Sequence, residues 1–299
     1  MKSVPGQLEV SVENPLVSVL VPCYNRERYI EEALLSVLEQ DYSNFELIVV
    51  DDGSQDSSAE KIEALRQRHD FQFYRQSNQG VSAALNTALS YARGVFIATP
   101  DSDDVMLPGR LSRQVNYLQA HPEVGCVGGK VIYVNEQGQR IKAEKASGVR
   151  RFSFDELLAS ANAVGGGVAM YRHDALERAG GYDPEIRVQD FQITLKVAHL
   201  GYCVDVLPDL GTLYRQHSSN LSKTAYKRQL NYDLMTIAPY RGHPCYSQGR
   251  TCVINKALKQ SVVHDKGYAL SLLLRMPPWR WNRVTWRRVR HLLFKFREK

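Results

Sequence analysis

The feature that most constrains the fold is a repeated alternation of short apolar runs with helical segments over the first hundred residues. Apolar, β-favouring runs occupy residues 17–21, 45–50, 71–74 and 95–99, and helix-spaced apolar residues follow each of the first three. Strands that alternate with helices form right-handed βαβ units, in which consecutive strands are parallel. The sequence therefore predicts an α/β protein with a doubly wound, mainly parallel sheet.

Each apolar run is followed by a loop of polar or turn-forming residues. The four loops are Pro22-Cys23-Tyr24-Asn25, Asp51-Asp52-Gly53-Ser54, Ser77-Asn78-Gln79-Gly80 and Asp101-Ser102-Asp103-Asp104. Because ligands bind such sheets outside the carboxyl ends of the strands, we expect all four loops to border one crevice. Neither the Gly-x-Gly-x-x-Gly pattern nor the P-loop pattern occurs in the chain, which argues against a nicotinamide or P-loop nucleotide site.

The fourth loop carries three carboxylates within four positions, Asp101, Asp103 and Asp104. Carboxylates this close repel one another unless a positive group lies between them. A divalent cation such as Mg²⁺ or Mn²⁺ suits these hard oxygen ligands. A solvated acidic turn or a helix cap is the alternative, because Asp is common in both. The cluster by itself is compatible with either interpretation.

Beyond this loop the pattern predicts a mixed sheet. Residues 124–127 and 130–134 read as strands, and residues 135–138 read as the turn of a hairpin, which breaks the parallel order. Residues 142–153 are polar and basic without periodicity, which favours a loop over the site.

Residues 17–25, 50–54 and 101–104, taken together in order and strand context, resemble the family 2 glycosyltransferases. That family has the GT-A fold of the nucleotide-diphospho-sugar transferase superfamily. The resemblance extends to about residue 221. It implies a nucleotide-sugar donor, usually a UDP-sugar, and a Mg²⁺ or Mn²⁺ ion.

The resemblance also implies roles for residues that bind the donor. Pro22 and Tyr24 would wall the base, and Asp52 would accept a hydrogen bond from the uracil ring. Asp101 would face the ribose or the donor sugar. The remaining expected donor contacts are Asn25, Asn78 and Ser102. The alternatives are a partly buried structural tyrosine at position 24 and a plain Asp-Gly turn at position 52.

By the same resemblance, Asp103 would ligate the metal and Asp104 would support it as a neighbouring carboxylate or a helix cap. Residues 214–217 resemble the Tyr-Arg-x-His segment that closes many family 2 domains, which makes His217 a tentative metal ligand and Arg215 a supporting residue. A solvent-facing His217 and an Arg215 that pairs with a carboxylate in the sheet are the alternatives. Arg110 is expected either to reach a phosphate or to be exposed on its helix.

Asp190 stands at the start of a helix with apolar residues at helical spacing. As an N-cap it would be purely structural. In the family this position, commonly written Glu-Asp, supplies the catalytic base, although Gln189 replaces the glutamate here. A carboxylate opposite the leaving group would take the acceptor's proton in a single displacement with inversion.

The last quarter of the chain lacks family motifs and reads as helical and basic. Residues 275–299 interleave tryptophans with arginines, which suits the headgroup zone of an anionic membrane. Nucleic-acid binding and plain packing of an amphipathic helix are the alternatives; of these, no nucleic acid is expected.

The chain's five scattered cysteines form no Cys-x-x-Cys pair, which argues against a zinc site and for a reducing compartment. The first ten residues contain no apolar segment of a secretory signal. The expected location is therefore the cytoplasm, with the protein peripheral on the inner face of the cytoplasmic membrane.

The sequence thus predicts an N-terminal extension (1–15), a GT-A domain (16–221, divided into a nucleotide-binding half, 16–105, and an acceptor half, 106–221) and a helical C-terminal region (222–299). The expected activity is that of an inverting, metal-dependent hexosyltransferase-type enzyme. Its acceptor would be a polysaccharide or a lipid-linked oligosaccharide. A sugar nucleotidyltransferase and a catalytically silent nucleotide-sugar or membrane-binding module remain alternatives.

Overall fold

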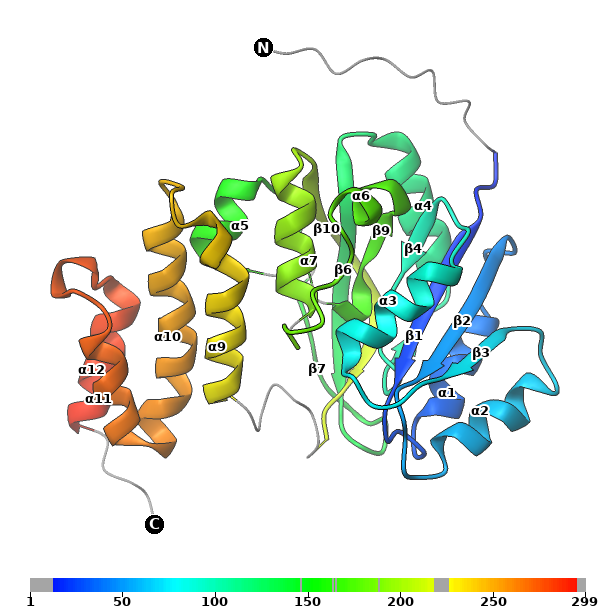
Figure 1. Ribbon diagram of the computed structural model, residues 1–299, viewed down its shortest axis with the longest axis horizontal. Coiled ribbons are helices and arrows are strands. Elements are labelled where there is room, and N and C mark those ends of the chain that lie inside the picture. The colour runs from blue at the N-terminus through cyan, green and yellow to red at the C-terminus, as the bar shows by residue number, and fades with distance from the viewer. Residues whose placement is uncertain are drawn as a thin grey trace.

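The computed structural model is a mixed α/β protein in which helices cover both faces of a central sheet (Figure 1). It describes residues 13–145, 147–162, 164, 166–187, 189–217 and 226–294. Most of the predicted N-terminal extension, the predicted boundary at residue 221 and residues 295–299 of the tail lie outside these ranges.

The sheet in this part of the chain has ten strands, eight of them in the order β3-β2-β1-β4-β9-β6-β10-β5. Pairings among β1 to β4 and between β6 and β10 are parallel and join most of the paired residues, whereas β5, β7, β8 and β9 pair antiparallel. The strands are β1 (Val17–Cys23), β2 (Phe45–Asp51), β3 (Gln72–Arg75), β4 (Phe96–Ala98), β5 (Val105–Met106), β6 (Val124–Val134), β7 (Arg140–Ala143), β8 (Arg150–Phe152), β9 (Met170–Arg172) and β10 (Cys203–Arg215). The predicted mixed, mainly parallel sheet is confirmed.

Helices connect the strands and then continue alone at the C-terminal end. They are α1 (Ile30–Leu38), α2 (Ser58–Arg66), α3 (Val81–Tyr91), α4 (Arg110–Ala120), α5 (Phe154–Ser160), α6 (His173–Arg178), α7 (Gln189–His199), α9 (Tyr226–Ile237), α10 (Tyr246–His264), α11 (Lys266–Leu274) and α12 (Arg283–Phe294). Three 3₁₀ turns, η1 (Gly166–Val168), η2 (Ala238–Tyr240) and η3 (Pro278–Arg280), complete the described elements. None of the helices described is long and apolar enough to cross a membrane.

Successive residues of the inner strands belong to different hydrophobic clusters, because side chains of a strand alternate between the two faces of the sheet. Val19 of β1 belongs to the cluster that includes Leu34 of α1 and Leu111 of α4. Leu20, the next residue, belongs to the cluster that includes Leu85 of α3. Burial on both faces explains why these strands are mainly apolar.

The C-terminal helices α9 to α11 share the second of these clusters, since Leu230, Leu258 and Leu272 belong to it together with Leu20. Figure 1 shows these helices in yellow to red, at the opposite end of the molecule from β1 to β3. Helix α10 approaches α5 closely at Gly249, where a Cβ atom would clash with the carbonyl oxygen of Leu158. The helical region is therefore packed against the sheet domain.

Two local predictions beyond residue 120 are wrong. The two strands predicted at 124–127 and 130–134 form one continuous strand, β6, because pairing with β10 continues through Gly128 and resumes at Lys130 after a register shift. The predicted loop at 142–153 includes the end of β7 and the whole of β8, which pairs antiparallel with β10. The two arginines of β8 hide the apolar pattern of a strand, and β8 forms because it pairs with β10, which is distant in the sequence.

Candidate functional site

The loops after β1, β2 and β3 contact one another at the carboxyl edge of the sheet. The Asp52 N–H donates to the Cys23 carbonyl at 2.8 Å, and the Asn25 N–H donates to Ser54 Oγ at 2.9 Å. Asn78 Nδ2 donates to the Asp52 carbonyl at 3.0 Å. The loops meet as the topology predicts, and the loop after β4 joins them through the contacts described below.

Asp52 organises the loop that enters α3. Its buried carboxylate accepts Gln76 Nε2 at 2.7 Å and the Gln79 N–H at 2.9 Å on Oδ1, and the Gly80 N–H at 2.7 Å on Oδ2. Gly80 has φ +94°, a conformation that L side chains rarely adopt. Gly53 also has a positive φ, +76°, as the Asp-Gly alternative would require, but Asp52 is in addition a buried acceptor that fixes this loop.

The other expected donor contacts lie around the same edge. Tyr24 is 41% exposed, so its ring is available at the surface of the crevice. Asn25 has φ +52°, and its Oδ1 accepts the Gln55 N–H at 2.8 Å, which ties the β1 loop to the β2 loop. Ser102 is buried within the acidic loop. Pro22 lines a small cavity with Asp101.

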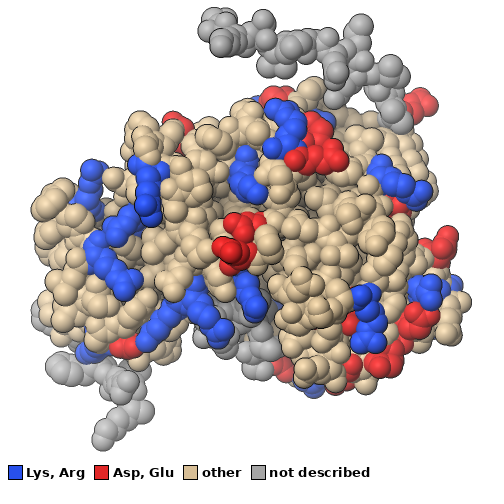
Figure 2. Space-filling model, in the orientation of Figure 1, with Lys and Arg blue, Asp and Glu red and all other residues tan. Residues whose placement is uncertain are grey.

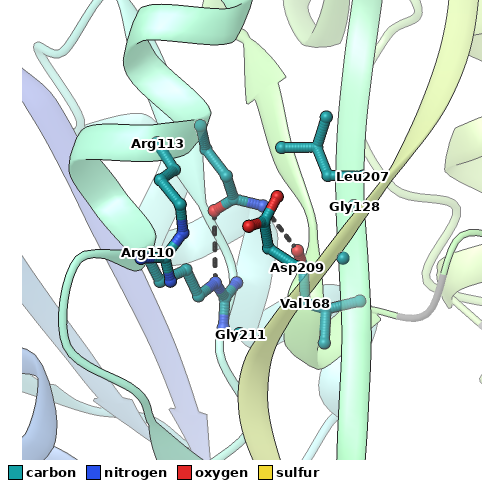
Figure 3. Close-up of a pocket in the computed structure, with 9 residues that line it drawn as sticks. Arg110, Arg113, Gly128, Val168, Leu207, Asp209 and Gly211 are labelled. Carbon is teal, nitrogen blue, oxygen red and sulfur yellow. Dashed lines mark hydrogen bonds between the residues drawn. The ribbon is translucent and has the colours of Figure 1, made fainter. Parts of the chain in front are cut away.

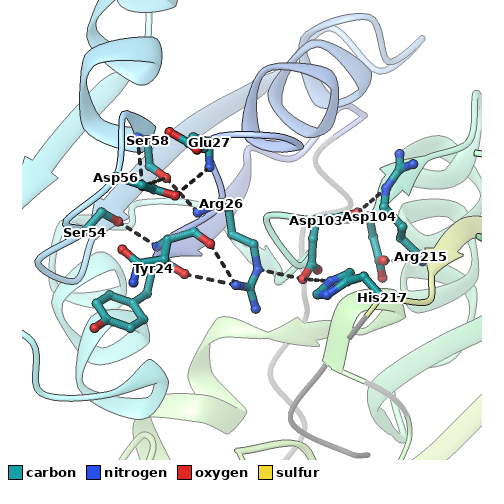
Figure 4. Close-up of polar contacts among 11 residues, drawn as sticks. Tyr24, Arg26, Glu27, Ser54, Asp56, Ser58, Asp103, Asp104, Arg215 and His217 are labelled. Carbon is teal, nitrogen blue, oxygen red and sulfur yellow. Dashed lines mark hydrogen bonds and ion pairs between the residues drawn. The ribbon is translucent and has the colours of Figure 1, made fainter. Parts of the chain in front are cut away.

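The carboxylates of the fourth loop have different environments, and Figure 4 shows those of Asp103 and Asp104. Asp103 Oδ2 accepts Arg26 Nε at 2.7 Å and lies 3.0 Å from His217 Nε2. Burial opposes ionisation of Asp103, yet its hydrogen bonds and charge attraction to His217 and Arg26 lower its pKa overall. Asp104 Oδ1 accepts the Arg215 N–H at 2.8 Å, while burial and the nearby Asp103 charge raise the Asp104 pKa to about 8.

Arg215 is held by a carboxylate and an aromatic ring. Its Nη2 donates to Glu32 Oε2 at 2.6 Å, and its guanidinium lies 5.0 Å from the Tyr29 ring centre. Its Nε donates to the Asp103 carbonyl at 3.1 Å. The structure thus realises the carboxylate-pairing alternative for Arg215, although with α1 and not within the sheet. His217 is buried and stacks on the same Tyr29 ring at 5.2 Å, so it is not the solvent-facing histidine of the alternative interpretation.

Arg110 is buried, so the expectation that it is exposed on its helix is wrong. It is 2% exposed, and its Nη1 donates to the Gly167 carbonyl at 2.7 Å and to Thr212 Oγ1 at 2.9 Å. Figure 3 shows it beside a separate small pocket between α4, β6 and β10, where its Nε also donates to Gln114 Oε1 at 3.1 Å. Burial lowers the Arg110 pKa to about 10, while Asp101 and Asp104 oppose that shift.

Asp190 lies in the first turn of α7 and reaches the same small cavity as Asp101. Two tyrosines, Tyr171 and Tyr182, line this cavity, and burial raises the pKa of both phenols. Burial, followed by the charges of the neighbouring carboxylates including Asp190, raises the Asp101 pKa well above its usual value. Two acidic side chains from distant parts of the chain therefore share one enclosed, low-dielectric space.

The acidic loop fits a divalent cation. Asp103 and His217 present an oxygen and a nitrogen 3.0 Å apart, a mixed donor set that Mn²⁺ accepts. Asp104 Oδ2 is buried beside them and has no hydrogen-bond partner among the residues described. A cation near these atoms would relieve the mutual repulsion of the carboxylates.

A second set of possible metal ligands lies away from the crevice, although the sequence argued against a zinc site. The ligand atoms of Asp155, His243 and Cys245 lie within 4.8 Å of one another. His243 Nδ1 accepts the Cys245 N–H at 3.2 Å, and His243 Nε2 lies 3.4 Å from Asp155 Oδ1. The three side chains thus connect α5 with the start of α10.

Several residues that shape the site were not expected from the sequence. Arg26 follows Asn25 directly, so its place in the β1 loop was visible, but its partner Asp103 was not. Glu32, which holds Arg215, was one of several acidic residues on an exposed-looking helix. Gly167 lies so close to Asp101 that an added Cβ would be 2.7 Å from Asp101 Oδ2, and only the local run of glycines hinted at such an approach.

Sequence comparison places the chain among glycosyltransferases. The family model described as "Glycosyl transferase family 2" matches residues 18–180, more than half of the 299 residues. The chain is 29% identical over 232 residues to the amylovoran biosynthesis glycosyltransferase AmsE of Erwinia amylovora, covering 76% of this chain and 85% of that protein. It is 38% identical over 131 residues to an uncharacterised glycosyltransferase of Haemophilus influenzae, of which it spans about half, 52%.

Structural comparison gives the same fold. S. aureus TarS 1–349 in complex with UDP-GlcNAc is similar with a TM-score of 0.65 and 21% identity, over 87% of this chain and 79% of that one. The mannosyltransferase PcManGT from Pyrobaculum calidifontis, in complex with GDP-Man and Mn²⁺, is similar with a TM-score of 0.61 and 21% identity, over 94% and 85%. The GT-A fold implied by the sequence resemblance is confirmed.

Proposed function

This chain belongs to glycosyl transferase family 2, and we propose that it moves a sugar from a UDP-sugar to a hydroxyl group of a glycan acceptor with inversion. The observation that carries the proposal is the cavity shared by Asp101 and Asp190 at the carboxyl edge of the sheet. In a member of this family, a pair of half-buried carboxylates that line one cavity next to the expected donor site supports a reaction centre.

The proposed donor site is formed by the loops after β1, β2 and β3. Tyr24, exposed at the edge, would stack on the base, and Pro22 would complete the wall. Asp52 would accept the imide N–H of uracil, since a carboxylate has lone pairs beyond the three donors it already accepts. Additional contacts are proposed for Asn25, Asn78, Asp101 and Ser102. The UDP-GlcNAc complex of TarS, a protein of the same fold, supports a uridine donor.

The proposed metal site consists of Asp103 and His217, supported by Asp104 and Arg215. A Mn²⁺ or Mg²⁺ ion bound there would neutralise the diphosphate as it leaves. The short Asp103–His217 separation and the unpartnered Asp104 Oδ2 support this site. The Mn²⁺ in the PcManGT complex supports it by fold analogy.

Asp190 is proposed as the general base. Its carboxylate would take the proton of the acceptor hydroxyl as that oxygen attacks the anomeric carbon. Asp101, which lines the same cavity, would hold the donor sugar in place for an in-line attack. Tyr171 and Tyr182 close the cavity around the reacting atoms and keep water out.

The proposed acceptor is a polysaccharide or a lipid-linked oligosaccharide, supported by the similarity to the amylovoran biosynthesis enzyme AmsE. The chain would work in the cytoplasm, with residues 16–221 as the transferase domain and residues 222–299 as a helical region that touches the inner membrane face. Residues 266–294 contain seven Lys and Arg residues and neither Asp nor Glu. Figure 2 shows that Lys and Arg predominate over the helical end, while the end with β1 to β3 carries both signs. Such a basic, Trp-bearing surface suits anionic lipids.

A panel of nucleotide sugars tests the proposal directly. Each is incubated with the protein and Mn²⁺, Mg²⁺ or EDTA, while melting temperature and sugar release or transfer are followed. One UDP-sugar is expected to raise the melting temperature and to be turned over only with the cation. If no nucleotide sugar stabilises the protein or is turned over, the proposed function is wrong. Formation of a new sugar nucleotide instead of a glycoside would favour a nucleotidyltransferase.

A further inference from the structure

Arg26 occupies the position where the proposed metal site needs a free carboxylate oxygen. Its Nε donates to Asp103 Oδ2 at 2.7 Å, and His217 Nε2 lies 3.0 Å from that same oxygen (Figure 4). The side chains of Arg26 and Asp103 are only 20% and 13% exposed, so water screens this ion pair poorly. A guanidinium and a divalent cation cannot share one buried oxygen without strong repulsion.

The backbone of Arg26 is fixed, but its side chain can turn. The Arg26 N–H donates to Ser58 Oγ at 2.7 Å, and Ser58 Oγ in turn donates to Asp56 Oδ1 at 2.5 Å. Asp56 Oδ2 also accepts the Glu27 N–H at 3.1 Å, so the loop is anchored to the start of α2. Among the residues that the structure describes, the guanidinium is otherwise held by neighbouring carbonyls, Nη1 donating to the Asn25 carbonyl at 2.9 Å and to the Tyr24 carbonyl at 3.2 Å.

Those two carbonyls belong to the residues proposed to contact the donor, so the guanidinium lies between the donor loop and the metal carboxylate. A bound nucleotide diphosphate would offer it new anionic partners of the kind that arginine binds best. If Arg26 moved away from Asp103 without such an anionic partner, the ion pair would be lost with no interaction to replace it.

We propose that Arg26 is an internal competitor of the divalent cation, paired with Asp103 when the site is empty and transferred to the diphosphate when the donor binds. The inference rests on the proposed function. It makes donor and cation binding mutually dependent. The cation alone must displace Arg26 from Asp103 when no diphosphate is present to bind the guanidinium. When nucleotide and cation bind together, the cation pairs with Asp103 and the diphosphate pairs with Arg26. By linkage, each then strengthens the binding of the other.

The test measures Mn²⁺ affinity of the full chain after EDTA treatment, by electron paramagnetic resonance titration, with and without UDP. For the native protein, UDP is expected to tighten Mn²⁺ binding by about tenfold or more, in the usual range of such coupling. Arg26→Gln removes the competitor, so Mn²⁺ alone should bind several-fold tighter and the effect of UDP should shrink. If that variant does not fold, Arg26→Lys, which loses the guanidinium fork, should change both quantities in the same direction.

Arg28→Gln is the matched control, because Arg28 lies two residues away with a side chain 74% exposed and only a 3.9 Å contact to Glu136. It should leave Mn²⁺ affinity and the UDP effect unchanged. Equal Mn²⁺ affinity in native protein and Arg26→Gln would overturn the inference, as would an equal gain in Arg28→Gln. Sugar transfer that proceeds while UDP has no effect on Mn²⁺ affinity would contradict the competition and leave the proposed function standing.

Discussion

Asp101 and Asp190 line one small cavity, although Asp101 follows β4 and Asp190 lies in the first turn of α7. Two carboxylates in one enclosed space repel each other when both are ionised, and the charge of Asp190 is among the causes that raise the Asp101 pKa. In the proposed reaction Asp101 holds the donor sugar and Asp190 takes the proton of the acceptor hydroxyl. Their shared cavity brings these two proposed roles into one space.

Asp103→Asn tests the proposed metal site. The amide replaces one anionic ligand with a neutral one, so the metal-dependent affinity for the UDP-sugar should fall at least about tenfold. Titration calorimetry with Mn²⁺ and with EDTA measures the change. Asp41→Asn, at an exposed position, is the control. Unchanged metal dependence in Asp103→Asn would remove Asp103 from the site.

Gly167→Ala tests how closely the backbone must approach the acidic loop. The new Cβ would lie 2.7 Å from Asp101 Oδ2 and 3.3 Å from Asp104 Oδ2, so the carboxylates must shift. We expect a loss of about 1–3 kcal/mol in unfolding free energy and a drop of about 100-fold in transfer rate. Gly148→Ala has no atom within 4 Å of the new Cβ and should alter neither quantity. Full activity of Gly167→Ala would show that the site tolerates displacement of Asp101.

Asp233 predicts a pH dependence of stability that is independent of the catalytic site. It is 3% exposed on α9, and burial raises its pKa although Lys256 of α10 and Gln229 Nε2, at 3.0 Å, oppose the shift. The folded state therefore keeps this proton to higher pH than the unfolded state, so the unfolding free energy falls as pH rises above about 4.

Asp233→Asn should remove that part of the slope. Its stability relative to the native protein should improve as the pH rises from 4 to 7, because the variant has no carboxyl group to ionise at this position. Urea unfolding at several pH values measures the difference, with Asp70→Asn at an exposed position as control. If the difference in unfolding free energy between variant and native protein were the same at every pH, burial would not raise the pKa of Asp233.

We expect the C-terminal helices to bind anionic lipid. Trp279 and Trp286 are 81% and 57% exposed in the basic region. The double variant Trp279→Ala/Trp286→Ala should bind phosphatidylglycerol vesicles several-fold more weakly, because interfacial tryptophans contribute apolar burial beside the arginines. Ile141→Ala removes an apolar side chain that is 54% exposed on β7 and should bind like the native protein. Equal, weak binding by all three proteins would argue for plain packing of the tail.

The α/β architecture followed from the sequence because β1, β2 and β4 are apolar on both faces and end in loops with strong turn residues. Prediction from the local sequence pattern failed for strands that form because they pair with distant strands. The strand β8, with two arginines in three residues, exists because it pairs with β10, and β6 runs through two glycines because β10 supports it. Neither partner is visible within a short window of sequence.

The candidate site divides in the same way. Asp52, Asp103 and Asp190 could be selected from the sequence because each stands at the end of a predicted strand or the start of a predicted helix and matches a motif of the family resemblance. The interaction partners of the site residues could not be predicted in this way. Arg26, Glu32 and Arg110 resemble ordinary surface residues in the sequence, and only the fold shows that they bind Asp103, Arg215 and the Gly167 carbonyl.

The most direct test of the account compares sugar transfer and donor binding in Asp190→Asn. With the UDP-sugar identified by the panel, the variant should lose about 100-fold or more in transfer rate, the usual scale for general base catalysis. Its donor affinity, measured by calorimetry with Mn²⁺, should stay within about threefold of the native value, because the base acts only in the transition state. Near-normal transfer by Asp190→Asn would contradict the assignment of the base and, with it, the proposed mechanism.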